Sequence, residues 1–242
     1  MKIPYICCLM LITAWAQSTR AGVILDQEYL VDPSRSWSNY YLDFPGDYLQ
    51  QTFTVRHSGK LVGIGVQVSL HPYPYPWYPS EPPIDDLHLK VVRTDADGFA
   101  LIDEVLAEAT IPPSRLISLD HDLPGPITDV DLTSWHASVL KGEKLAITFS
   151  SNQTDHSGPK YGTNYQWFRN YHNPHPGGEY STYSPKYYGA KPLRDIWLGG
   201  GDPTVDAGFR VYVDIPEPSS LLILLSCVAF GAVSRGESRI LP

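Results

Sequence analysis

Apolar and polar side chains alternate along several short segments of this chain. The clearest segment is 64–70, with the sequence IGVQVSL, and the same period of two recurs in 87–92, 145–149 and 209–213. Because successive side chains of a strand point to opposite faces of a sheet, this period predicts half-buried β-strands, with one face on a core and one in water. Shorter candidate strands are 52–55, 105–111, 127–132, 165–170 and 195–198.

Turn-forming residues separate these segments at short intervals. The chain has 19 Gly and 22 Pro, and between its two ends no segment keeps a helical apolar period over three turns. Eight to ten short strands joined by turns predict an all-β fold. The expected architecture is a two-layer antiparallel β-sandwich of the jelly-roll kind.

Two longer segments interrupt this pattern, at 71–83 and 171–191. In the first, prolines alternate with the aromatic residues Tyr73, Tyr75, Trp77 and Tyr78. Proline cannot donate to a strand ladder, so we expect a stiff, extended loop. Its aromatic rings form a candidate platform for stacking against sugar rings, since Trp and Tyr combine a large apolar area with a polar edge. The alternative is that they bury one another at one end of the sandwich.

The N-terminus has the pattern of a secretory signal peptide. Lys2 precedes an apolar stretch over 3–14, and small residues follow at Ala14 and Ala16 and again at Thr19 and Ala21. This arrangement predicts that residues 1–21 direct export and are removed after Ala16 or Ala21.

The C-terminus carries a second apolar run, Leu221 to Val233, after the tripeptide Pro216-Glu217-Pro218. As a helix the run would extend about 20 Å, which is short for a bilayer core of about 30 Å. It is apolar on every side, so it has no face suited to water. A buried last helix of the fold is one alternative, and a permanent membrane anchor is another.

The same stretch resembles the PEP-CTERM sorting signal of exported bacterial proteins. The match comprises Pro216, Glu217 and Pro218, the leucine-rich run, and Arg235 after it, whereas the mixed tail 236–242 departs from the family pattern. The resemblance implies transient insertion of Leu221 to Val233 into the inner membrane and recognition by an exosortase-type enzyme. That enzyme would cut near the tripeptide and pass the protein to the cell surface or extracellular matrix. We therefore divide the chain into a signal peptide (1–21), a β-sandwich domain (22–215) and a sorting segment (216–242).

Composition narrows the choice of partners. Cys7, Cys8 and Cys227 all lie in the two ends, so the domain between them has no disulfide and no thiol nucleophile. The net charge is -8, and the domain is more acidic still because Lys2, Arg20, Arg235 and Arg239 also lie in the ends. Such a surface disfavours nucleic acid and anionic lipid as partners.

A second resemblance concerns the domain itself, which looks like an extracellular bacterial β-sandwich module with the layout of carbohydrate-binding jelly rolls. The segments that carry it are 51–55, 59–61, 94–98, 105–107, 139–147, 165–167, 173–178 and 208–213. It implies the fold more than any activity, and an extracellular polysaccharide is the partner that the aromatic loop would contact.

Candidate catalytic and metal sites are weak. The available acids are Asp85, Asp86, Asp103, Glu104, Asp129 and Asp131. We interpret them as ordinary turn and surface acids, because glycoside hydrolysis needs two carboxylates that face each other across a cleft.

The other candidates are His172 and His175, on a loop rich in Pro and Gly, and Asp95-Ala96-Asp97-Gly98. The latter begins like a calcium loop but lacks its later acids, so we predict a turn between two strands. No cofactor is expected, although a structural calcium held by backbone carbonyls stays open. Trp135, Trp167 and Trp197 are predicted to lie in the core.

These observations predict an exported, surface-sorted, non-catalytic protein of the cell envelope or polysaccharide matrix, with weak glycan binding as a further option. The alternative is a secreted glycan-active enzyme, either a glycoside hydrolase or a lyase.

Overall fold

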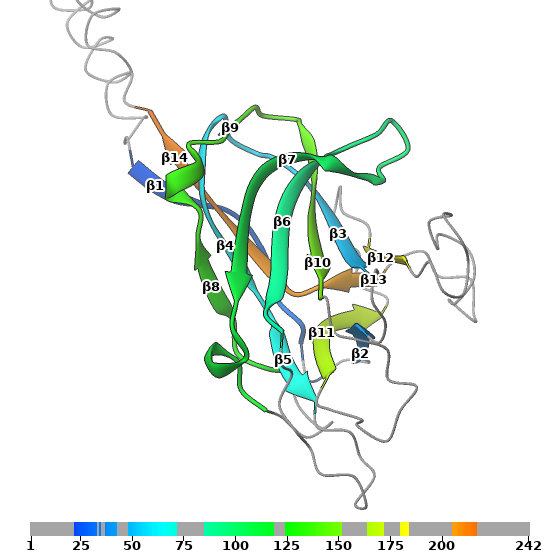
Figure 1. The fold of residues 1–242 in the computed structure, drawn as a ribbon. Coiled ribbons are helices and arrows are strands. Elements are labelled where there is room, and N and C mark those ends of the chain that lie inside the picture. Colours follow the sequence, from blue (N-terminus) through cyan, green and yellow to red (C-terminus); the bar gives the residue numbers. More distant parts are fainter. Residues whose placement is uncertain are drawn as a thin grey trace, which may run out of the picture. The chain divides into compact units, whose positions relative to one another are not determined.

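The described part of the chain is built almost entirely from β-strands (Figure 1). The computed structural model describes residues 22–32, 34, 37–42, 48–71, 85–118, 124–151, 164–171, 180–183 and 205–216. Residues 25–213 form one compact unit. A second unit contains 1–24 and 214–242, of which 22–24 and 214–216 are described.

The strands form three sheets. The first has the order β1 (Gly22–Tyr29), β14 (Phe209–Ile215), β4 (Gly59–Val66) and β8 (Thr128–Asp131), with β9 (Ser138–Val139) also on β4. The second has the order β12 (Tyr180–Tyr183), β3 (Tyr48–Thr54), β10 (Lys144–Ser150), β6 (Leu87–Thr94) and β7 (Ala100–Ile111). The third has β13 (Val205–Ala207), β11 (Asn164–Tyr171) and β2 (Trp37–Leu42), with β5 (Val68–His71) on β11.

The strand pairs whose registers are defined run antiparallel, as in β10 with β3 and with β6. Two short 3-10 turns, η1 (Pro113–Arg115) and η2 (Thr133–Trp135), complete the described elements.

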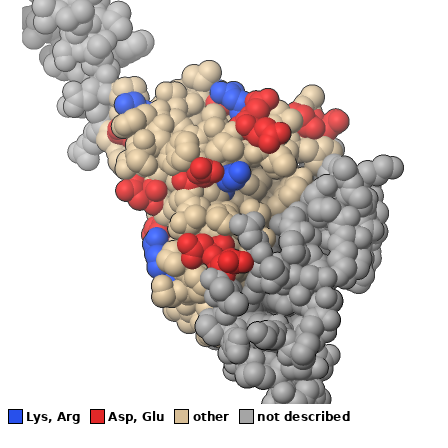
Figure 2. All heavy atoms as spheres, viewed as in Figure 1, with Lys and Arg blue, Asp and Glu red and all other residues tan. Residues whose placement is uncertain are grey.

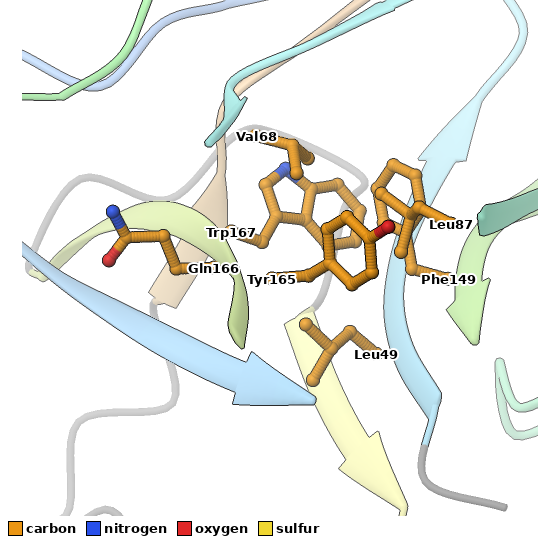
Figure 3. A pocket seen from close by; sticks show the side chains of 7 residues that line it. All are labelled: Leu49, Val68, Leu87, Phe149, Tyr165, Gln166 and Trp167. Carbon is orange, nitrogen blue, oxygen red and sulfur yellow. The ribbon is translucent and has the colours of Figure 1, made fainter. Parts of the chain in front are cut away.

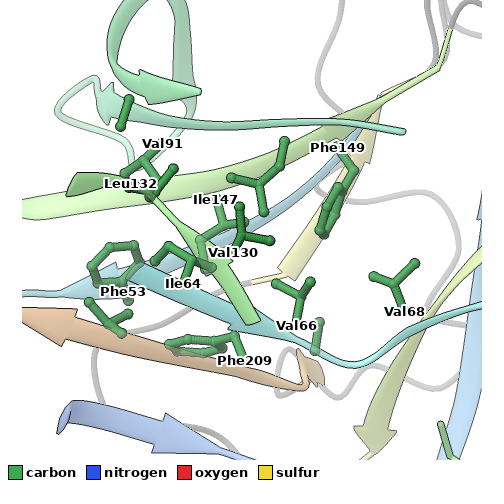
Figure 4. Close-up of a cluster of buried hydrophobic side chains, with 14 of the residues drawn as sticks. Phe53, Ile64, Val66, Val68, Val91, Val130, Leu132, Ile147, Phe149 and Phe209 are labelled. Carbon is green, nitrogen blue, oxygen red and sulfur yellow. The ribbon is translucent and has the colours of Figure 1, made fainter. Parts of the chain in front are cut away.

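The core lies between the first two sheets (Figure 4). Ile64 and Phe209 contribute from the first sheet, and Phe53 and Ile147 contribute from the second. The rings of Phe53 and Phe209 lie 6.0 Å apart between their centroids. These facing antiparallel sheets confirm the predicted all-β, sandwich-like character, and burial of apolar side chains is its main source of stability.

The alternating segments correspond to strands β6, β10 and β14, as predicted. The shorter segments at 52–55 and 105–111 belong to longer strands, β3 and β7, and those at 127–132 and 165–170 correspond to β8 and β11. Strands β1, β2, β9, β12 and β13 were not predicted, and β12 lies within 171–191, where a long loop was expected. The segment 195–198 lies outside the described residues.

The expectation that strands would be buried on one face only is wrong for β10. Ala146 and Thr148 on its outer face are buried, as are the core residues Leu145, Ile147 and Phe149 that alternate with them. Gln50, which pairs with Thr148 across the strands, shows part of the reason. Its Nε2 donates to the Gly98 carbonyl (2.9 Å) and its Oε1 accepts from the Ala100 N–H (2.9 Å). The tip of the β6–β7 hairpin therefore lies against this face and shields it from water.

Gln67 divides the predicted strand 64–70 into β4 and β5. Its N–H donates to the Gly208 carbonyl (3.0 Å), the Gly208 N–H donates to Phe168 (2.9 Å), and the Phe168 N–H donates back to Gln67 (3.2 Å). The side chain of Gln67 is buried, with Oε1 accepting from the Val31 N–H (2.7 Å) and Nε2 donating to the Gly125 carbonyl (3.2 Å). This ring of main-chain hydrogen bonds is the point where the chain passes from the first sheet to the third.

The tryptophans divide between core and surface. Trp167 is 1% exposed, as predicted, and its Nε1 donates to the Gly208 carbonyl at 3.0 Å. The core prediction for Trp135 is wrong, because this residue is 43% exposed. It lies in η2, and its Nε1 donates to the Glu108 carbonyl of β7 at 2.7 Å. The indole covers the edge of a strand instead of filling the core. Trp197 lies outside the described residues.

Candidate functional site

The predicted sorting segment begins directly after the last strand that the structure describes. Strand β14 ends at Ile215, and Pro216 follows it as an exposed residue. Proline lacks the N–H that a continuing strand would donate, so it ends the ladder here. Glu217, Pro218, Arg235 and the run 221–233 lie outside the described residues, as does the signal peptide 1–21. Within the residues that the structure describes, no helix is both long enough and apolar enough to cross a bilayer.

The aromatic loop connects β5 to β6. Its residues Tyr73, Tyr75, Trp77 and Tyr78 fall in 72–84, outside the described residues. The chain becomes described again at Asp85, where the carbonyl accepts a hydrogen bond from the Tyr165 hydroxyl at 2.5 Å. Burial, helped by the charges of Asp86 and Asp85, raises the pKa of Tyr165 well above its ordinary value. Tyr165 thus fixes the point at which this loop rejoins the sheets.

The side chains beneath that point form an apolar cluster (Figure 3). The residues that line it are Leu49, Val68, Leu87, Phe149, Tyr165, Gln166 and Trp167. Phe149 and Trp167 meet edge to face, with 4.6 Å between ring centroids and 88° between planes. The space between these side chains is too small for a water molecule. This cluster is therefore a part of the core and not a ligand pocket.

The six candidate acids lie in three separate places. Two come just before β6, two lie on β7 and two lie on β8 (Asp85 and Asp86, Asp103 and Glu104, Asp129 and Asp131). Asp131 accepts a hydrogen bond from the Thr133 N–H at 2.9 Å, and this bond lowers the pKa of its carboxyl group. Glu104 lies 4.0 Å from the Arg93 guanidinium. The carboxylate of Asp129 lies across Gly65, where a methyl group would come within 2.6 Å of its oxygen. These three acids have local structural contacts, which agrees with our interpretation of them as surface and turn residues.

The other predicted chemistry is also local. Asp95 Oδ1 accepts from the N–H groups of Asp97 (2.9 Å) and Phe99 (2.8 Å), which confirms the turn predicted for 95–98. His172 and His175 lie outside the described residues. Across the described ranges, no three His, Cys, Asp or Glu side chains gather in a way that could hold a metal ion.

A buried carboxylate was missed in the sequence. The side chain of Asp26 is fully buried, and it lies 2.9 Å from Nδ1 of the half-exposed His57. It also accepts from the Arg56 N–H (3.0 Å) and from Gln27 Nε2 (3.2 Å). This contact joins the 55–58 turn to β1 and fixes the orientation of the imidazole. No short motif connects two residues that lie so far apart in the chain.

Two turns meet beside this pair. The Val55 N–H donates to Glu143 (2.9 Å), the Gly142 N–H donates to Val55 (2.8 Å), and the Lys141 N–H donates to Ser58 Oγ (2.9 Å). The two turns and the first residues of the strands that follow them, β4 and β10, carry four basic residues. We call these residues, Arg56, Lys60, Lys141 and Lys144, the basic turn cluster. Three of them are exposed, and Lys144 is half-buried. The net charge of the whole domain is acidic and does not reveal this cluster, so it was not predicted.

Neither the models of known protein families nor the curated proteins contain a match to this chain.

Proposed function

We propose that this protein is exported, sorted to the surface and non-catalytic, and that it belongs to the cell envelope or the extracellular polysaccharide matrix. The observation that carries the proposal is the order of Pro216-Glu217-Pro218, the apolar run 221–233 and Arg235. The end of β14 at Ile215 supports it, because the tripeptide then follows the last strand directly and Pro216 is exposed.

The physical logic of the sorting step follows from these residue types. Prolines favour extended backbone, which is the conformation that a protease binds. The apolar run would hold the chain in the inner membrane, with Arg235 favouring a cytoplasmic C-terminus. An exosortase-type enzyme would then cut near the tripeptide and release the domain to the surface.

In this proposal the domain is a jelly-roll-like module that contacts polysaccharide weakly. Two facing antiparallel sheets with a shared core support that assignment. Tyr73, Tyr75, Trp77 and Tyr78 would supply the contact by stacking on sugar rings. Few exposed stacking contacts give low affinity, because ordering the partners costs free energy.

The test is mass spectrometry of the C-terminal peptide from surface-extracted protein. We expect wild-type surface protein to end near Pro218 and to lack 221–233. Glu217→Ala should stay in the membrane fraction with the run intact. Glu237→Ala is the matched control, since it removes the same charge from the tail beyond the run, and it should be processed normally. Recovery of an intact 221–233 segment in wild-type surface protein would contradict processing and indicate a permanent anchor.

A further inference from the structure

Basic residues gather at one end of the unit formed by 25–213. The described residues include nine Lys and Arg, and four of them form the basic turn cluster. Three of the other basic residues form ion pairs: Lys90 with Glu108, Arg93 with Glu143 of the 140–143 turn, and Arg210 with Glu28. In the part of the chain that the structure describes, none of the four cluster residues makes an ion pair. On the face drawn in Figure 2, the few basic side chains lie beside acidic ones, and other acidic groups stand without a basic neighbour.

Two acids beside the cluster already have partners. Glu143 is the one acid in the segments 55–60 and 140–144. Its carboxylate accepts from Arg93 (2.7 Å) and from the Leu140 N–H (3.0 Å). The Asp26 carboxylate is fully buried beneath His57. The positive charge of this surface is therefore not neutralised from within the two turns, although the whole chain is acidic.

An apolar residue stands among these charges. Leu140 is 67% exposed, beside Lys141 in the 140–143 turn. The two turns are hydrogen-bonded to each other, so they present Leu140 and the basic side chains as one preorganised surface. An exposed apolar side chain next to basic residues is a combination that binds an anionic bilayer surface, with the apolar group at the headgroup level.

The direction of β14 shows where the chain leaves this unit. That point lies at the end that carries the basic turn cluster. A methyl group on Gly65 would lie 3.3 Å from Arg210, and one on Gly63 would lie 3.4 Å from Tyr212. Strand β14 thus runs toward the end where β4 begins, beside the 55–58 turn. The chain leaves this unit at Val213, and the apolar run starts at Leu221. Eight residues span at most about 29 Å.

We propose that the basic turn cluster docks on the anionic headgroups of the bilayer that receives the run 221–233. This inference rests on the proposed function, since it needs the run to enter a membrane. The short connection then keeps the cluster within reach of that surface. Each Lys or Arg close to an anionic bilayer strengthens binding by about fivefold. Docking would hold the Pro216 segment at the membrane surface for the processing enzyme.

Lysine acetylation of the full chain tests the proposal. The chain is mixed with vesicles of phosphatidylcholine, with or without phosphatidylglycerol, and the modified lysines are quantified by mass spectrometry. We expect acetylation of Lys60 and Lys141 to fall about fivefold in the anionic vesicles and to recover at about 0.5 M salt. Lys90 is the internal control, because it is 37% exposed and lies on β6 opposite Glu108, and its acetylation should not change.

A charge-reversed variant, Arg56→Glu with Lys141→Glu, should lose the protection of Lys60. The control Lys90→Glu with Arg115→Glu reverses two charges outside the cluster. In this control, anionic vesicles should still protect Lys60 from acetylation. Flotation distinguishes the two proposals. A chain that floats with both vesicles but shows equal acetylation of Lys141 overturns the docking alone, whereas a chain that floats with neither overturns both. A third outcome is that polygalacturonate, added to the chain in detergent, protects Lys60 and Lys141 from acetylation while anionic vesicles do not. That result also overturns the docking and assigns the cluster to an acidic polysaccharide.

Discussion

Replacing Gly208 by alanine should disturb the junction between the first and third sheets more than any ordinary Gly→Ala change. A methyl group at this position would lie 2.0 Å from Gln67 Oε1 and 2.7 Å from Gln67 Cδ. The main chain of Gly208 cannot easily yield, since its carbonyl accepts from Gln67 N and Trp167 Nε1 and its N–H donates to Phe168. The Gln67 side chain must therefore move, and it then loses its hydrogen bonds to Val31 and Gly125.

The magnitude follows from these two effects. Overpacking a filled site costs about 1–3 kcal/mol. Leaving the buried Val31 N–H without its acceptor costs about 1–3 kcal/mol more. We expect Gly208→Ala to lower the free energy of unfolding by roughly 3–5 kcal/mol, a large share of the stability of an ordinary domain.

Two controls separate this mechanism from a general effect of alanine. In a Gln67→Ala background only Cβ of residue 67 remains near the new methyl group, at 3.0 Å. Gly208→Ala should therefore cost at least about 1 kcal/mol less there than in the wild type, and the pair should be non-additive. Gly142→Ala has open space around it but a φ of +87°. It should cost about 1–2 kcal/mol through backbone strain alone.

Equilibrium urea unfolding, followed by circular dichroism, measures all four variants against the wild type. An equal cost of Gly208→Ala in both backgrounds would refute the reasoning, because the Gln67 side chain would then not be what the new methyl group meets.

Two further predictions concern Tyr165 and Trp77. The pKa of Tyr165 is raised in the folded state, so the unfolded chain loses this proton first. The protonated Tyr165 makes its full contribution to the free energy of unfolding below about pH 10. Above that pH the free energy of unfolding falls by up to about 1.4 kcal/mol per pH unit. Tyr165→Phe should show a shallower loss of stability between about pH 10 and pH 12 in urea unfolding, and an unchanged slope would contradict the assignment. Trp77→Ala should abolish weak retention on immobilised polysaccharide, while the exposed control Trp135→Ala should retain it; retention that survives Trp77→Ala would place the contact elsewhere.

The sequence alone was enough to locate most of the described strands and to identify the fold as all-β. Strands β6, β10 and β14 follow from the period of two, because alternation along a strand is a local consequence of backbone geometry. The turn at 95–98 is equally local, since the Asp95 side chain binds N–H groups two and four residues ahead. The proposed sorting segment is a short linear pattern, so that prediction too was made without a fold.

Tertiary structure decided what depends on distant residues. The split of 64–70 at Gln67 arises from contacts with Val31, Phe168 and Gly208, which no local period encodes. Trp135 and Trp167 were both predicted to lie in the core, yet one covers a strand edge and the other fills the core.

The pairing of Asp26 with His57 and the meeting of the 55–58 and 140–143 turns follow the same rule. A surface charge cluster is a property of which turns the sheets bring to one end. Strand order determines that arrangement, and strand order is set by long-range packing and not by the order of residues in any one segment.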